Sequence, residues 1–307
     1  MPFETIVGHD LPKQFLLRSL ESGRLAHAYL FLGPDGVGKA SLARAFAQML
    51  GVQGPADLLW ESCREGEKSL KIAQARELKQ WASLKPWGSP WKLAVVDEAH
   101  RMTEEAQNAL LKVLEEPPAQ MMLILIASSA QTLQSTIVSR CQIVRFGRLS
   151  MSEIQEGLTK TLPEVDAAVR TALSRLAFGS IGRAMRLGEE GCLEWRSKLV
   201  LRLAGNDGSI DWELPEAERD LQEMSLEWIV DFCRDLWVSS QRVLGVDLLN
   251  PDLAVPLELL ACRADPMEIL ELWSLCLRAQ SLLAQSINPK LLWPVVVNRF
   301  RATFSRG

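Results

Sequence analysis

The first 150 residues alternate between short apolar runs and longer segments whose apolar residues recur at helical spacing. An apolar run of about four to eight residues is typical of a strand buried on both faces of a parallel sheet. One helical segment follows residue 41, and another begins at the capping residue Thr103 and ends at a proline pair. The pattern predicts a parallel α/β sheet with strands at residues 28–32, 92–96, 121–127 and 142–146.

After residue 149, helical periodicity replaces the apolar runs, and we expect no strand beyond residue 151. The polar, glycine-containing stretch at residues 204–209 predicts a linker. The chain is therefore expected to divide into domains at residues 1–149, 150–206 and 207–307. Long helices are expected in the last of these, at residues 226–244, 266–283 and 289–304.

A phosphate-binding pattern lies between the first expected strand and its helix. Residues 33–41 follow G-x-x-x-x-G-K-[ST], except that Ala40 replaces the hydroxyl residue. In this pattern backbone N–H groups surround phosphate oxygens, the lysine reaches the terminal phosphates, and the hydroxyl ligates Mg²⁺. We expect nucleotide phosphates to be bound by Gly33, Gly36, Gly38, Lys39 and Ser41.

Two carboxylates follow the expected strand at residues 92–96. The carboxyl ends of parallel strands point at the ligand crevice, so Asp97 and Glu98 are expected to face the same site as the phosphate loop. Asp97 would hold Mg²⁺ through water, and Glu98 would be the catalytic residue that polarises the attacking water. The alternative is a strand that ends in two solvated acids, and the upstream loop disfavours it.

Composition restricts the partners and the compartment. The net charge of -4 means that contact with nucleic acid needs a local basic strip or neighbouring subunits. Six cysteines without a C-x-x-C pair indicate reduced thiols and no zinc, which favours a cytoplasmic protein. We expect a soluble protein without a leader, because no segment approaches the roughly 18 apolar residues of a membrane span.

Further motifs point to one family. They are the Asn-Ala-Leu-Leu-Lys helix within residues 107–118, the triplet Ser139-Arg140-Cys141, and the segments 6–9, 26–31, 179–184 and 288–289. With these motifs the chain resembles the bacterial clamp-loader subunits of the AAA+ superfamily, most closely the delta prime branch of DNA polymerase III. The likeness covers nearly the full length, and the helix together with the triplet is more specific than the phosphate loop.

The resemblance implies an AAA+ P-loop domain, a helical lid and a helical oligomerisation collar for the three domains. It implies that Arg140 acts in trans as an arginine finger in a neighbour's nucleotide site, and a surface ion pair is the alternative. The implied partners are gamma/tau and delta subunits in a hetero-pentamer, with the sliding clamp and primed DNA reached through the complex. The implied cofactor is ATP or ADP with Mg²⁺, held weakly or as a vestige.

The phosphate loop and the segment after it depart from the family's working ATPases. Ala40 removes the magnesium hydroxyl, and Ser41 cannot simply replace it because it points about 100° further round the helix. Catalytic relatives carry a cysteine-rich zinc module in the interval that corresponds to residues 51–91. That interval holds only Cys63, so we expect no metal there.

The remaining nucleotide contacts implied by the family are Val7, Ser128 and Arg183. Ser128, or Ser129 beside it, matches the family's polar sensor weakly, and Gly182 stands where catalytic subunits place an arginine. Arg183 is thereby turned about 100° away from the phosphates. These departures together predict that hydrolysis is absent or slow.

Two alternative functions stay open. Because Lys39, Asp97 and Glu98 are intact, the first is a catalytically active AAA+ ATPase subunit of gamma/tau type. The second is another P-loop ATPase or a small-molecule kinase, which the helical second half and Ser139–Cys141 disfavour.

An unusual group of tryptophans precedes the acidic strand. Trp81, Trp87 and Trp91 lie beside lysines and could stack on single-stranded DNA, but packing in the core or in a subunit interface is the favoured interpretation.

Overall fold

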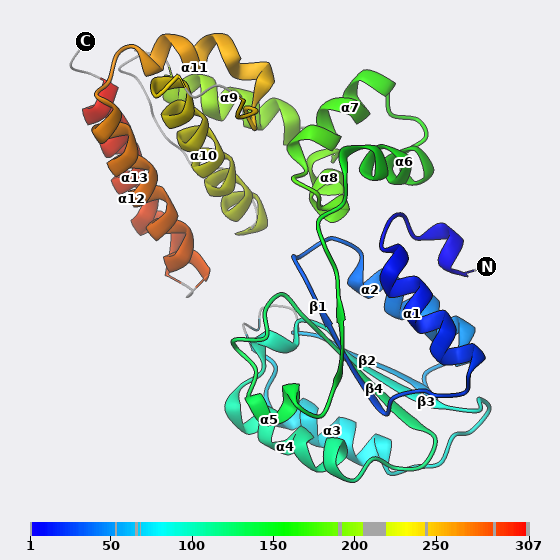
Figure 1. The fold of residues 1–307 in the computed structure, drawn as a ribbon. Coiled ribbons are helices and arrows are strands. Elements are labelled where there is room, and N and C mark those ends of the chain that lie inside the picture. Colours follow the sequence, from blue (N-terminus) through cyan, green and yellow to red (C-terminus); the bar gives the residue numbers. More distant parts are fainter. Residues whose placement is uncertain are drawn as a thin grey trace. The chain divides into compact units, whose positions relative to one another are not determined.

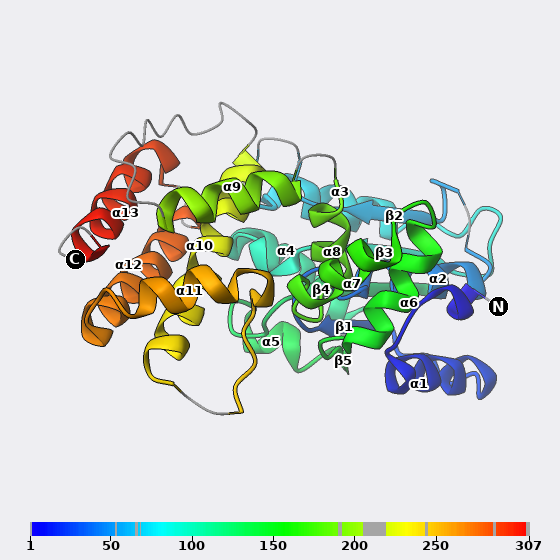
Figure 2. The ribbon, with the colours of Figure 1, turned by 90° about the horizontal axis from the view of Figure 1, so that it is seen from above.

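The computed structural model describes residues 2–52, 54–64, 67, 69–189, 192–204, 219–242, 245–284 and 287–304. The chain forms two compact units, Met1–Arg186 and Leu187–Gly307, and each is described by itself (Figure 1; Figure 2). The domain boundary expected between residues 206 and 207 lies outside the described residues.

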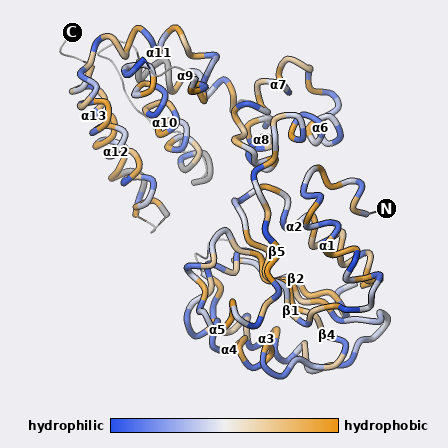
Figure 3. The backbone as a smooth tube through the Cα atoms, in the orientation of Figure 1, coloured by the Kyte–Doolittle hydropathy of each residue, from blue (hydrophilic) through white to orange (hydrophobic). Residues whose placement is uncertain are grey.

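A five-stranded parallel sheet forms the centre of the first unit, in the order β2-β3-β4-β1-β5. Every residue of β1, β3 and β4 is buried, which explains their apolar runs, and Figure 3 shows the apolar colour gathered on these strands. The expected parallel α/β fold is confirmed, and β2 is a strand beyond the four expected. The strands are β1 (Ala28–Leu32), β2 (Leu58–Glu61), β3 (Lys92–Val96), β4 (Met121–Ala127) and β5 (Gln142–Arg145).

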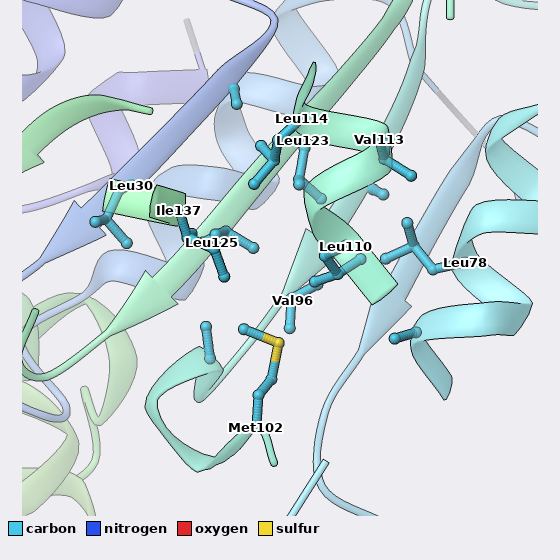
Figure 4. Close-up of a cluster of buried hydrophobic side chains, with 14 of the residues drawn as sticks. Leu30, Leu78, Val96, Met102, Leu110, Val113, Leu114, Leu123, Leu125 and Ile137 are labelled. Carbon is cyan, nitrogen blue, oxygen red and sulfur yellow. The ribbon is translucent and has the colours of Figure 1, made fainter. Parts of the chain in front are cut away.

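Helices cover both faces of this sheet, because alternate residues of each strand point to opposite sides. Leu30 packs with α3, α4 and α5 on one face (Figure 4), whereas Tyr29 and Phe31 pack with α1 and α2 on the other. The helices are η1 (Pro2–Thr5), α1 (Asp10–Glu21), α2 (Lys39–Met49), α3 (Ile72–Ala82), η2 (Ala99–Arg101), α4 (Glu104–Glu115) and α5 (Ser135–Val138).

The helix α4 follows the predicted pattern closely. The Thr103 hydroxyl oxygen accepts a hydrogen bond of 3.3 Å from the Ala106 N–H, which caps the first turn. Its apolar stripe buries Ala106, Leu110 and Leu114 in the core shown in Figure 4. The helix ends at Glu115, before the proline pair, so the start, the buried face and the end of α4 all agree with the sequence.

Three short helices complete the first unit, and no strand follows β5 in the described part of the chain. A capping box between Ser150 and Glu153 begins α6. Gly157 of α6 leaves the space that the Ile181 side chain fills, because a Cβ atom at Gly157 would lie 2.2 Å from Ile181 Cδ1. This contact fixes the start of α8 against α6. The three helices are α6 (Met151–Thr161), α7 (Ala167–Leu176) and α8 (Ile181–Leu187).

Helices are the regular elements of the second unit over its described residues. A buried polar network joins α9, α10 and the segment before α11: the Arg196 guanidinium donates to Asp252 and Asn250, and the fully buried Asp235 accepts from Asn250. No helix among the described residues is long and apolar enough to cross a membrane. The elements are α9 (Cys192–Ala204), α10 (Arg219–Ser240), η3 (Pro251–Leu253), α11 (Ala254–Ala261), α12 (Pro266–Ala284) and α13 (Pro289–Phe304).

Candidate nucleotide site

A cavity of about 380 Å³ lies in the first unit, at the carboxyl ends of strands β3 and β4 and the start of α2. Parallel sheets bind their ligands at this edge. The phosphate loop, the acid pair after β3 and the start of α8 all contribute to it. The lining residues are Asp35, Gly36, Gly38, Lys39, Ala40, Ser41, Asp97, Glu98, His100, Ile126, Ala127, Ile181, Gly182 and Met185.

Glycine is required twice in the phosphate loop by close approach of other groups. A Cβ atom at Gly33 would lie 2.3 Å from the Phe146 carbonyl oxygen. A Cβ atom at Gly36, whose φ is +71°, would lie 2.4 Å from Ser180 Oγ. Gly36 lines the cavity, whereas Gly33 is not among the residues that line it. Glycine at position 33 therefore allows the loop to pack closely against the backbone of Phe146.

Lys39 is bound by the loop that carries it. Its ammonium donates hydrogen bonds to the carbonyl oxygens of Gly33 (2.5 Å) and Pro34 (2.7 Å), and Nζ lies 3.6 Å from Asp35 Oδ1. Only 6% of the residue is exposed. Burial lowers the pKa of Lys39, and the neighbouring Asp35 and Asp97 carboxylates oppose that shift. Phosphate oxygens would replace the loop carbonyls as partners of this ammonium.

The predicted acid pair faces the same cavity. Asp97 Oδ1 accepts a 3.0 Å hydrogen bond from the Glu98 N–H, and Glu98 Oε2 accepts one of 2.9 Å from Arg101. Ala40 also lines the cavity and its side chain offers no ligand atom. Over the described residues, no group of three His, Cys, Asp or Glu side chains is arranged to hold a metal. The cavity therefore fits nucleotide phosphates, but it offers Mg²⁺ fewer protein ligands than a complete phosphate loop does.

Three predicted nucleotide contacts lie apart from the cavity lining. Val7 is buried beside Gly157, and the Ser128 N–H donates a 3.4 Å hydrogen bond to His100 Nδ1. The Arg183 guanidinium carbon lies 4.8 Å from the centre of the Phe178 ring. None of the three is among the residues that line the cavity.

The start of α8 bonds directly to the phosphate loop, which sequence reasoning missed. The Gly182 N–H donates a 2.8 Å hydrogen bond to the Gly36 carbonyl oxygen, and Ser180 Oγ donates one of 3.0 Å to the Asp35 carbonyl oxygen. A Cβ atom at Gly182 would lie 3.0 Å from Gly36 Cα, so glycine at both positions allows the two backbones to touch. The segment 179–184 was recognised only as a family motif.

Two histidines at the loop were also missed. His9 Nε2 lies 2.7 Å from the Val37 carbonyl oxygen, and His100 lines the cavity next to the acid pair. Burial lowers the pKa of both imidazoles. His9 lies in the recognised segment 6–9 and His100 comes two residues after Glu98, so proximity to these motifs was the available signal.

Arg140 lies between α5 and β5 and does not line its own chain's cavity. Its Nη2 is 2.9 Å from Glu115 Oε1, and its Nη1 donates a 2.9 Å hydrogen bond to the Thr136 carbonyl oxygen. The side chain is 36% exposed. Both interpretations of the sequence fit this position, because the arginine makes an ion pair within the chain and also reaches the surface.

The interval that was expected to lack zinc contains β2 and α3, and Cys63 packs against the core. The three tryptophans of the predicted group separate into two kinds. Trp81 packs on the core and lies under Lys92 Nζ at 3.9 Å, and Trp91 packs on the opposite face of the sheet. Trp87 is 90% exposed, so the core interpretation holds for the first two alone.

The family model and the curated relatives described here are all subunits of DNA polymerase III. A family model described as "DNA polymerase III, delta subunit" matches residues 8–68 and 56–150. DNA polymerase III subunit tau of Salmonella typhimurium is 32% identical over 209 residues, which are 61% of this chain and 33% of that protein. Subunit delta prime of Bacillus subtilis is 36% identical over 166 residues, 47% of this chain and 49% of that protein.

Among solved structures, a DNA polymerase III gamma subunit-related protein from Thermotoga maritima aligns with 96% of this chain and 99% of its own, at 19% identity and a TM-score of 0.49. The chain spans between 33% and 49% of the length of the two curated relatives above. Residues 8–150, which carry the sheet and the phosphate loop, are therefore similar to subunits of DNA polymerase III.

Proposed function

We propose that this chain is a delta prime-like subunit of the DNA polymerase III clamp loader, with a degenerate ATPase site of its own. Ala40 and Gly182 line the cavity at the positions where the family's ATPases carry a hydroxyl and an arginine. Hydrolysis at this site is therefore absent or slow, and bound ATP or ADP is held weakly. The chain works in a hetero-pentamer with gamma/tau and delta subunits and helps to load the sliding clamp onto primed DNA.

The observation that carries the proposal is the position of Arg140. An arginine that acts in a neighbour's site must lie outside its own cavity and reach the surface, and Arg140 does both. On assembly its guanidinium exchanges the Glu115 carboxylate for the γ-phosphate of the neighbour's ATP. There it stabilises the charge that develops during transfer, an effect of about 10³ to 10⁵ in rate for arginine fingers.

Substitution of Arg140 in the reconstituted assembly tests this role. We expect Arg140→Ala to lower ATP hydrolysis at the neighbouring site by about 10³-fold and to leave the folding of this chain unchanged. Arg145→Ala is the matched control, because Arg145 is an exposed arginine on the adjacent strand β5. Glu115→Gln removes the intrachain partner and should preserve activity. Equal activity of the Arg140 and Arg145 variants would contradict the finger role.

An active gamma/tau-like ATPase is the second candidate, since Lys39, Asp97 and Glu98 all line the cavity. Magnesium-dependent ATP hydrolysis by the isolated chain separates the two functions. We expect negligible turnover by the unmodified chain. Rapid turnover, little changed in an Ala40→Thr variant, would show that Asp97 and water suffice to hold Mg²⁺ and would support the second candidate instead.

A further inference from the structure

The charged groups that line the cavity are unbalanced. Three carboxylates, those of Asp35, Asp97 and Glu98, face it with one ammonium, that of Lys39. The His100 imidazole adds little positive charge at neutral pH, because burial lowers its pKa. Even with Arg101, which lies 2.9 Å from Glu98 Oε2, counted beside Lys39, the carboxylates exceed the permanently cationic groups before any ligand enters.

Asp35 is the carboxylate within the phosphate loop itself. It lies between Gly33 and Gly36, and its Oδ1 is 3.6 Å from Lys39 Nζ. The hydrogen bond from Ser180 Oγ to its carbonyl oxygen fixes the backbone, whereas its side chain is 76% exposed. The loop lysine is the group that reaches the β and γ phosphates. Terminal phosphate oxygens bound to Lys39 would therefore lie close to the Asp35 carboxylate.

We propose that Asp35 makes this site selective for a nucleoside diphosphate over a nucleoside triphosphate. The inference rests on the proposed nucleotide site and adds its ligand preference. A triphosphate brings one more negative charge toward the carboxylate that already occupies Lys39. Mg²⁺ normally offsets this repulsion, but Ala40 gives it no hydroxyl ligand here. A diphosphate carries one negative charge fewer, so it is repelled less by the Asp35 carboxylate and binds more tightly.

Competition against a fluorescent ADP analogue, with ADP or ATP as the competitor and with or without Mg²⁺, tests the preference on the full chain. We expect the unmodified chain to bind ADP about tenfold more tightly than ATP, since one extra charge a few ångströms from a carboxylate has an effect of that size. Asp35→Asn keeps the shape and removes the charge. It should tighten ATP binding by about tenfold and ADP binding by about threefold or less.

Asp10→Asn is the matched control, because Asp10 is also an exposed aspartate near a lysine, 3.8 Å from Lys13 Nζ, and it lies outside the cavity lining. We expect this variant to bind both nucleotides as the unmodified chain does. An equal gain for ATP and ADP in Asp35→Asn, or no gain, would overturn the inference, as would a failure of every variant to bind nucleotide. None of these results affects the Arg140 assay, so the two proposals fail separately.

Discussion

Gly182→Ala is a small change that should release α8 from the phosphate loop. The new Cβ atom would lie 3.0 Å from Gly36 Cα and 3.3 Å from the Gly36 carbonyl oxygen. Both are backbone atoms and cannot turn aside, so the start of α8 has to shift by a few tenths of an ångström. We expect that shift to weaken the 2.8 Å hydrogen bond from the Gly182 N–H and the 3.0 Å bond from Ser180 Oγ to the loop.

The size of the effect follows from those two bonds. A neutral hydrogen bond contributes about 1 kcal/mol net, so weakening both bonds costs the contact at most about 2 kcal/mol. The population of molecules in which α8 has left the loop should then rise by at most about 30-fold. Alanine also raises helix propensity by about 1 kcal/mol relative to glycine, which opposes unfolding of α8 but not its movement as an intact helix. Thermal melting would mix the two effects, so a local measurement is needed.

Amide hydrogen exchange followed at residues 33–41 and 179–187 provides that measurement. We expect faster exchange in both segments of the Gly182→Ala variant and unchanged exchange in β1, which lies in the core. Gly147→Ala is the control, because a Cβ atom at Gly147 would meet nothing within 4 Å. If the two variants exchange alike in these segments, α8 is not held by the contact between the two glycines.

Three further predictions concern stability. Asp57 is buried, and its carboxylate accepts hydrogen bonds of 2.8 to 2.9 Å from the N–H groups of Trp87, Gly88 and Ser89. Burial alone would raise the pKa of Asp57, but these hydrogen bonds together lower it. Asp57→Asn should therefore lower the free energy of unfolding in urea by about 2 kcal/mol at pH 7. This difference from the unmodified chain should shrink as pH falls below about 4 through the lowered pKa. An equal difference at pH 3 would contradict the prediction. Trp87→Ser, at an exposed side chain, should change the same free energy by less than about 0.5 kcal/mol. Asp235→Ala should lower the free energy of unfolding by about 3 kcal/mol, because the buried N–H of Asn250 loses its carboxylate acceptor. A variant that unfolds at the same urea concentration as the unmodified chain would contradict this prediction.

Apolar periodicity predicted the elements that are buried on both sides. The expected bounds of β1, β3 and β4 agree with the structure, because each strand lies inside the sheet and helices cover both of its faces. The edge strand β2 was not predicted: its residues are only half-buried, and four residues give too short a pattern. The helix α11 was missed for a related reason, since apolar residues such as Val255 and Leu259 remain exposed on it.

The lining of the cavity was predictable where a local pattern encodes it. Gly36, Gly38 and Lys39 lie in one stretch of backbone whose shape depends on their own conformations. The bond between Ser180 and the loop joins groups 145 residues apart. The Gly182 bond uses a backbone N–H that every residue except proline possesses. One sequence therefore does not identify the partner in either of these contacts.

The same distinction separates the binding of phosphate from its hydrolysis. Binding of phosphate depends on a short continuous segment around Lys39, so it persists as long as that segment folds. Hydrolysis needs groups from several elements at once, and Ala40 of α2 and Gly182 of α8 lie on two different elements around the cavity. Loss of a catalytic group from either element would slow hydrolysis and leave the loop in place. A complete phosphate loop is therefore weaker evidence for an ATPase than the converging groups around it.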